Sequence, residues 1–142
     1  MSTTIDYVIS ELQDFESNGD ASNDVGRLYQ ILTDFELLPH RERAVVALFG
    51  VIERFPENDF GSPGPLVHAL EAIPGYEPFL MESLRRVPAE LSVWMVNRIL
   101  NSDLPAEANA VWVNELRQVL KNPAALTSAR ESAKEFLEYQ GA

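Results

Sequence analysis

The sequence contains no cysteine. Disulfide bonds, thiolate nucleophiles and cysteine-based metal sites are therefore excluded. Histidine is nearly as scarce, with only His40 and His68, and neither belongs to a zinc motif such as HExxH. His68 also lies beside the apolar positions of a predicted helix. The sequence therefore predicts no metal site and no cofactor.

Long apolar runs are also missing. The first residues, MSTTIDYVISELQDFE, have no basic segment followed by an apolar core, so they do not resemble a signal peptide. No stretch approaches the roughly 18 apolar residues that a membrane-spanning helix needs. With 46% apolar residues in 142, the chain is expected to form one globular domain over residues 1–142 and to be cytoplasmic.

Catalytic signatures are lacking as well. The chain has no glycine-rich phosphate loop and no GxSxG motif. Glu53 and Glu57 stand one helical turn apart, but the intervening Pro56 interrupts a helix, and an exposed acidic rim is the favoured interpretation. Asp59 follows Glu57 as in a calcium loop, yet the rest of that motif is absent. We therefore expect a protein that is not an enzyme.

Basic residues are few: 11 against 22 acidic residues, for a net charge of −11. Residues 1–71 contain 13 of the acidic residues and only four basic ones, so the negative charge is concentrated in that half. Such a field repels nucleic acids and anionic membranes and attracts a cationic protein. The alternative is that the acidity serves solubility alone.

Apolar residues recur at helical spacing along the whole chain, and no stretch alternates as a strand would. Prolines mark the starts of several helices. The fold class is predicted to be all-α, with about eight short antiparallel helices in a HEAT- or armadillo-like stack; a compact orthogonal helical bundle is the alternative. The predicted helices cover roughly residues 4–17, 24–35, 39–55, 65–73, 78–87, 89–101, 105–120 and 123–137.

The helix predicted over residues 89–101 is apolar on nearly every side and should form the centre of the core. Trp94, Met95 and Trp112 fit core positions better than a ligand site. Arg98 is one of few polar residues in this helix. We expect it either to pair with Glu71 or Glu82 on a neighbouring helix or to open onto a binding surface.

Three details concern helix ends and contacts. Asn23 or Asp24 is expected to cap the second helix, and Asn101 to end the sixth in the left-handed region. Gly50 is expected to allow another helix to approach closely. Arg85 and Arg86 suit the C-terminal end of their helix, where cations interact well with the helix dipole.

Residues 56–65, PENDFGSPGP, form the only long irregular segment, with three prolines and two glycines around Phe60. This composition is typical of a loop, and loops on a rigid scaffold often carry binding residues.

Turn and packing motifs mark residues 53–101: Glu53-Arg54-Phe55-Pro56, Asp59 to Gly61, His68-Ala69-Leu70-Glu71, Pro74-Gly75-Tyr76-Glu77-Pro78, Glu82-Ser83, Arg85-Arg86, Pro88 and Met95-Val96-Asn97-Arg98. In these motifs the central stretch resembles a family of small all-helical bacterial immunity proteins that accompany polymorphic or contact-dependent growth inhibition toxins. The resemblance covers about a third of the chain.

The resemblance implies a non-catalytic toxin inhibitor that blocks one cognate toxin stoichiometrically. Because many such toxins are cationic nucleases, the acidic half of this chain suits one. A monomer when free and a heterodimer with the toxin are expected. Carboxylates would pair with toxin Lys and Arg, and two aromatic rings would act as anchors. The predicted toxin-binding residues are Glu53, Glu57, Asp59, Phe60, Tyr76 and Glu77, with Asp20, Asp24 and Glu36 extending the surface.

Two other functions stay open. One is a helical-repeat scaffold or adaptor protein in an unrelated pathway, which the predicted helical stack would suit. The other is a hydrolase that uses converging carboxylates, which would require a cleft and a metal ion.

Overall fold

The computed structural model describes residues 4–61 and 63–142, and in this part of the chain it contains helices and no strand. The predicted all-α fold is therefore confirmed. The α-helices are α1 (Ile5–Asp14), α2 (Ala21–Ile31), α3 (Val45–Arg54), α4 (Gly64–Glu71), α5 (Glu77–Arg86), α6 (Glu90–Leu100), α7 (Ala106–Lys121) and α8 (Thr127–Tyr139). Two short 3-10 helices, η1 (Phe35–Leu37) and η2 (Arg41–Ala44), connect α2 to α3.

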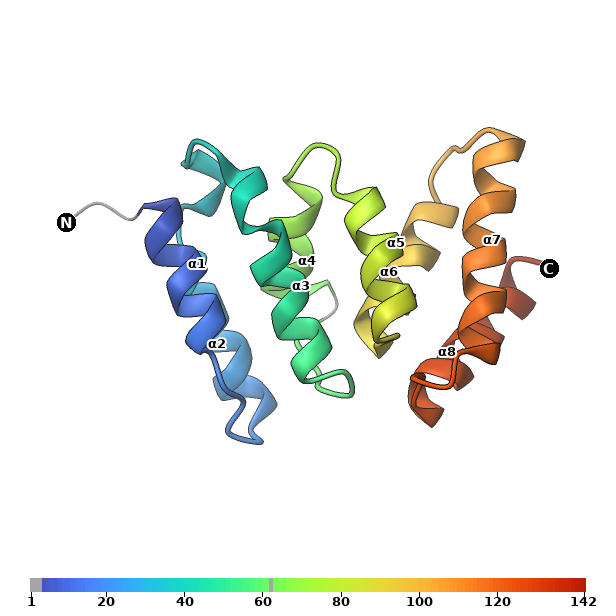
Figure 1. The fold of residues 1–142 in the computed structure, drawn as a ribbon, viewed down its shortest axis with the longest axis horizontal. Helices are drawn as coiled ribbons and strands as arrows, with labels where there is room; N and C mark the ends of the chain where they lie inside the picture. Colours follow the sequence, from blue (N-terminus) through green and yellow to red (C-terminus); the bar gives the residue numbers. More distant parts are fainter. Residues whose placement is uncertain (1–3, 62) are drawn as a thin grey trace.

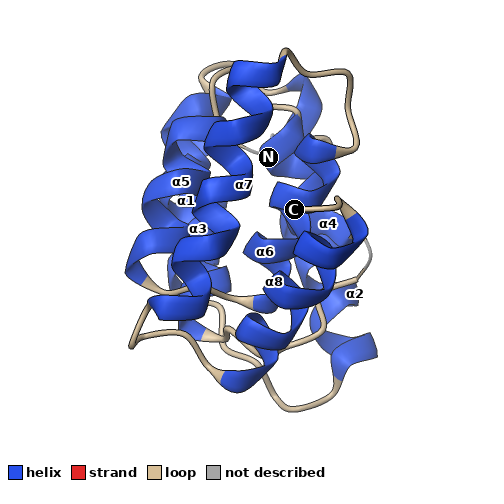
Figure 2. Ribbon diagram, turned by 90° about the vertical axis from the view of Figure 1, so that its right-hand side faces the viewer, coloured by secondary structure: helices blue, strands red, loops and turns tan. Residues whose placement is uncertain are grey.

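The α-helices form two layers. Helices α1, α3, α5 and α7 lie side by side in one layer, and α2, α4, α6 and α8 lie behind them in the other (Figures 1 and 2). Each helix of the first layer is followed by its partner in the second, so the chain forms four helical hairpins placed next to one another. A closer relation to HEAT or armadillo repeats stays a prediction.

Helix α6 is buried as its sequence predicts. It packs against α5, α7 and α8, and Met95 and Val96 are at most 1% exposed. Its buried Ser92 is satisfied locally, because its hydroxyl donates to the Ala89 carbonyl and accepts from the Ala89 N–H, both at 3.0 Å. Trp112 is also in the core, whereas Trp94 is only partly buried and packs against the edge of the core.

Ion pairs connect helices that are distant in the sequence. Arg98 of α6 donates two hydrogen bonds to Glu71 of α4, at 2.8 and 2.7 Å, which confirms one of the two partners that we expected for it. Because α4 and α6 have few backbone contacts, this bidentate pair is their main polar connection. On the other layer, Arg85 of α5 pairs with Glu115 of α7.

Three expectations about helix ends and contacts are wrong. Asp20 caps α2 by accepting from the Asn23 N–H, so neither predicted residue is the cap. Asn101 has a right-handed φ of −80°. A Cβ on Gly50 would meet only the Arg54 side chain, at 3.4 Å, so no second helix approaches there. Gly61 is the position that requires glycine. Its φ is +98°, and a Cβ added there would lie 2.7 Å from the Gly64 Cα.

Candidate functional site

The residues predicted to bind a partner lie at two opposite edges of the helical stack. The α1–α2 turn, the end of α3 and the loop over residues 55–61 lie at the lower edge of Figure 1. The segment over residues 33–40 and the α4–α5 turn lie at the upper edge. Asp20, Glu57 and Asp59 therefore belong to one edge, and Glu36 and Glu77 to the other. The predicted set does not form one surface.

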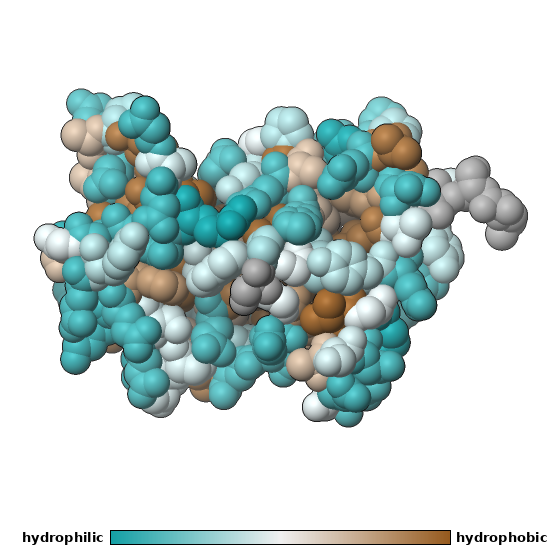
Figure 3. All heavy atoms as spheres, turned by 180° about the vertical axis from the view of Figure 1, so that it is seen from behind, coloured by the Kyte–Doolittle hydropathy of each residue, from teal (hydrophilic) through white to brown (hydrophobic). Residues whose placement is uncertain are grey.

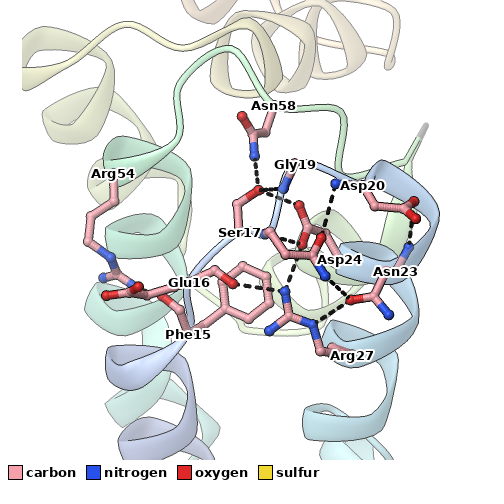
Figure 4. Close-up of polar contacts among 11 residues, drawn as sticks. Phe15, Glu16, Ser17, Gly19, Asp20, Asn23, Asp24, Arg27, Arg54 and Asn58 are labelled. Carbon is pink, nitrogen blue, oxygen red and sulfur yellow. Dashed lines mark hydrogen bonds and ion pairs between the residues drawn. The ribbon is translucent and has the colours of Figure 1, made fainter.

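Asp24 does not face a partner, because its side chain is buried in the first turns of α2. It accepts hydrogen bonds from the Ser17 hydroxyl (2.5 Å), the Asn18 N–H (3.2 Å) and the Arg27 guanidinium (2.7 Å). Burial alone would raise the pKa of the Asp24 carboxyl, but these hydrogen bonds and the charge of Arg27 outweigh it and hold the pKa below its usual value. Asp24 is the centre of the network in Figure 4.

Glu53 is also committed to the fold. One carboxylate oxygen accepts from Arg86 Nε at 2.9 Å, and the other accepts from Arg86 Nη2 and the Ser83 hydroxyl, each at 2.8 Å. The Glu53 side chain is only 16% exposed. It therefore fixes α3 against α5, and the assignment of Glu53 to the binding surface stays a prediction.

The two predicted aromatic anchors lie inside the protein. Phe60 is 1% exposed and packs edge-on against Phe15 and Phe55, with ring centroids 6.3 and 6.5 Å apart. Tyr76 is 9% exposed. Burial, reinforced by the charges of Glu71 and Glu77, raises the pKa of Tyr76 to about 12. Neither ring can serve as an exposed anchor in this structure.

The loop over residues 55–61 is held at three points. Phe60 fills the aromatic cluster, the Glu90 N–H of α6 donates to the Pro56 carbonyl (3.1 Å), and Asn58 Nδ2 donates to the Ser17 hydroxyl (2.8 Å). Because Ser17 also donates to Asp24, the loop is linked to the network at the start of α2 (Figure 4). Glu57 and Asp59 thus extend into solvent from a fixed backbone.

A cleft of about 300 Å³ opens between this loop, α6 and α8. Two carboxylates, Asp59 and Glu90, and two partly buried aromatic rings, Trp94 and Phe136, contribute to its lining. Among the described residues, the Asp59 carboxylate accepts one hydrogen bond, from the Gly61 N–H (2.9 Å). Carboxylates beside aromatic rings suit a cationic side chain with an apolar stem, such as Lys or Arg.

Sequence reasoning identified Asp59 but missed the other walls of this loop cleft. Trp94 was assigned to the core because it lies in an apolar helix, and Glu90 and Phe136 belong to helices that no local motif connects to the loop. The proximity of α6, α8 and the loop is a tertiary contact. The one sequence signal for this cleft was the helical spacing of apolar residues in α8, which places Phe136 beside core residues.

All four basic residues in the first 71 positions are bound within the protein. Arg27 pairs with Asp24, and Arg43 with Asp6. Arg41 donates to the Glu36 backbone carbonyl. Arg54 donates to the carbonyls of Leu12 and Phe15, at 2.8 and 3.1 Å.

The exposed carboxylates at the lower edge therefore form no ion pair in the described part of the chain. Among the described residues, no basic group lies within 4 Å of these carboxylates. We call this surface the acidic edge: Glu16, Asp20, Glu57, Asp59 and Glu90.

The cleft at the upper edge is more nearly balanced in charge. It measures about 820 Å³ and contains Tyr76, Glu77 and the Glu71–Arg98 pair in its lining. Since Arg98 is held by Glu71 and also lies 5.1 Å from the Trp94 ring centroid, its role in this cleft is to fix α4 and α6. Glu77 is partly exposed there.

In the part of the chain that the structure describes, no three His, Asp or Glu side chains come together in a group that could hold a metal ion. Within the same residues, none of the helices has the length and apolar character required to cross a membrane. The chain matches no protein-family model, no curated protein and no solved structure, so the functional argument depends on its own residues.

Proposed function

We propose that this protein is a cytoplasmic immunity protein that binds and neutralises a basic bacterial toxin domain by stoichiometric blocking, without catalysis. The observation that supports the proposal is the acidic edge: exposed carboxylates that form no ion pair among the described residues, beside a cleft with aromatic walls. The resemblance of residues 53–101 to immunity proteins of contact-dependent toxin systems indicates the class of partner.

The charge arrangement favours rapid capture of a cationic protein. A net charge of −11, concentrated in residues 1–71, attracts a basic partner before contact and raises the association rate. If the partner is a nuclease, the carboxylates of the acidic edge occupy the positions that substrate phosphates would take. The inhibitor is then expected to be a monomer when free and one half of a heterodimer with its toxin.

The loop cleft supplies specificity in this proposal. A Lys or Arg side chain of the toxin lies with its stem against Trp94 and Phe136 and its charge between Asp59 and Glu90. Because Phe60 and Asn58 fix the loop, little side-chain or backbone freedom is lost on binding. This replaces Phe60 and Tyr76 with Trp94 and Phe136 as the aromatic contacts.

The direct test is binding to the toxin domain encoded beside this gene, together with protection of cells that express the toxin. We expect a stable complex at low ionic strength and restored growth on co-expression. Absence of a complex at low salt would reject the proposal for that toxin. Capture of a host protein without growth rescue would favour the scaffold or adaptor alternative.

The binding surface is tested by reversing two charges at the acidic edge, with Glu57→Lys and Asp59→Lys in one variant. We expect its association rate to fall about tenfold at low salt. The control reverses Glu131 and Glu138, two exposed carboxylates of α8 that do not line the cleft, and so changes the net charge equally. Equal rates for the two variants would show that the acidic edge is not the contact surface.

A further inference from the structure

A second groove lies at the upper edge of the stack, between the end of α2, η1 and α4. It measures about 420 Å³ and shares no residue with the loop cleft. Phe35, Pro65 and Ala69 are buried in its floor, whereas Tyr29 and Leu37 form an exposed apolar rim. Figure 3 shows apolar surface among hydrophilic side chains at this α2 end of the molecule.

The backbone of η1 presents Leu37 to solvent. A 3-10 helix repeats every three residues, so Phe35 and Leu38 share the face that packs on the core, and Leu37 lies outside it. Hydrogen bonds from the Leu37 N–H to the Asp34 carbonyl (2.9 Å) and from Arg41 to the Glu36 carbonyl hold this turn. As a result Leu37 is 80% exposed, the highest value among the large apolar side chains of the described residues.

The rim of the groove is acidic. Asp34 and Glu36 both line it, and both are exposed. Among the described residues, no basic side chain lies within 4 Å of either carboxylate, because Arg41 uses the backbone oxygen of Glu36. Tyr29 and His68 are the other titratable groups in the lining.

We infer that this groove docks a basic amphipathic helix of a partner protein. An apolar side chain of leucine size packs on Phe35, Pro65 and Ala69, and flanking Lys or Arg residues pair with Asp34 and Glu36. Charge complementarity selects this occupant. A second copy of this chain carries the same −11 charge, and an anionic membrane is repelled as well. The inference does not require the partner to be a toxin.

The test uses a fluorescein-labelled synthetic helix of Leu and Lys residues, roughly five turns long, followed by anisotropy. We expect Tyr29→Ser with Leu37→Ser to weaken binding about tenfold. The matched control is Val111→Ser with Tyr139→Ser, because these side chains are 49% and 73% exposed, against 49% and 80% in the groove. The control should change affinity less than about twofold.

The charge contribution is tested with Asp34→Asn and Glu36→Gln, which keep the shapes of both side chains. We expect a several-fold loss of peptide affinity in this variant. Circular dichroism verifies that each variant folds. If the Tyr29→Ser, Leu37→Ser variant does not fold, Leu37→Ser alone replaces it, because Leu37 is exposed. No binding by the wild type, or equal losses in groove and control variants, would overturn the inference. Self-association that Leu37→Ser abolishes would instead identify a second copy as the occupant.

Discussion

Asp24 and Arg27 show how side chains of an acidic protein can serve the fold instead of its surface. The Asp24 carboxylate is 1% exposed and accepts three hydrogen bonds, one of them from the Arg27 guanidinium, which also donates to the Glu16 carbonyl at 2.8 Å. Arg27 further lies over the Phe15 ring, 4.7 Å from its centroid. These contacts join the end of α1 to the start of α2.

Replacing Asp24 with Asn should lower the free energy of unfolding by about 2 kcal/mol at pH 7, because hydrogen bonds to a charged acceptor are lost. The pKa of Asp24 is lower in the folded than in the unfolded protein. Its contribution is therefore fully present above the unfolded pKa near 3.8 and is lost as the pH falls through the folded pKa. Urea unfolding at pH 7 and at acidic pH measures this difference.

The wild type and the Asp24→Asn variant should thus converge in stability on acidification. A difference between them that stays constant from neutral pH to below the folded pKa would contradict this role for the carboxylate charge.

Tyr76 gives a second titration that can be followed directly. Because burial raises its pKa to about 12, the absorbance of its phenolate should appear late in an alkaline titration. The Tyr76→Phe variant should lack this late component and otherwise retain the wild-type spectrum. A titration curve unchanged by the substitution would contradict the burial of this ring.

At the scale of elements, the loop over residues 55–61 combines an anchored backbone with exposed charges. Phe60→Ala should lower the free energy of unfolding by about 3–5 kcal/mol, because the ring fills the cluster with Phe15 and Phe55. Phe79→Ala is the control, since Phe79 is 40% exposed on α5, and it should have a much smaller effect. Thermal and denaturant unfolding measure both changes.

Similar losses for Phe60→Ala and Phe79→Ala would show that Phe60 is not part of the core and would restore it as a candidate surface anchor.

The helices themselves were predictable because each carries an apolar stripe, and prolines mark the starts of several of them. The end of α1 was not predictable. The sequence predicts a helix to residue 17, but α1 ends at Asp14 and Phe15 is extended, with ψ of 132°. The Arg54 guanidinium, far along the chain, hydrogen-bonds the Leu12 and Phe15 carbonyls there. A helix end satisfied by such a distant residue leaves no local sequence signal.

Contacts between residues that are distant in the sequence also limit which binding residues were predictable. Asp20, Glu57 and Asp59 are exposed, as polar residues in turns usually are. Glu53 and Asp24 have the same residue types, but Arg86 and Arg27 bind them inside the fold. Asp24 and Arg27 lie three residues apart within α2, whereas the Glu53–Arg86 pair depends on the packing of α3 against α5, which cannot be inferred from composition.

For the whole molecule, the net charge of −11 opposes compaction through repulsion among carboxylates. We expect the melting temperature to rise by a few degrees between low salt and roughly 0.5 M sodium chloride, because screening reduces this repulsion. The few exposed ion pairs weaken under the same conditions but contribute little. Calorimetry at several salt concentrations measures which of the two screening effects is larger. A melting temperature that falls with salt would show that the loss of ion pairs outweighs the relief of carboxylate repulsion.

All four basic residues in the first 71 positions are bound within the protein, and this affects which parts of the sequence can change during evolution. Three carboxylates of the acidic edge, Glu16, Glu57 and Glu90, form no ion pair or side-chain hydrogen bond among the described residues, unlike Asp20 and Asp59, so substituting these three changes stability little. Mutations at these three positions can therefore accumulate without unfolding the chain, while the helices and the ion pairs between them stay constant. A protein built this way can follow changes in its partner over generations by altering a few surface residues on an unchanged scaffold.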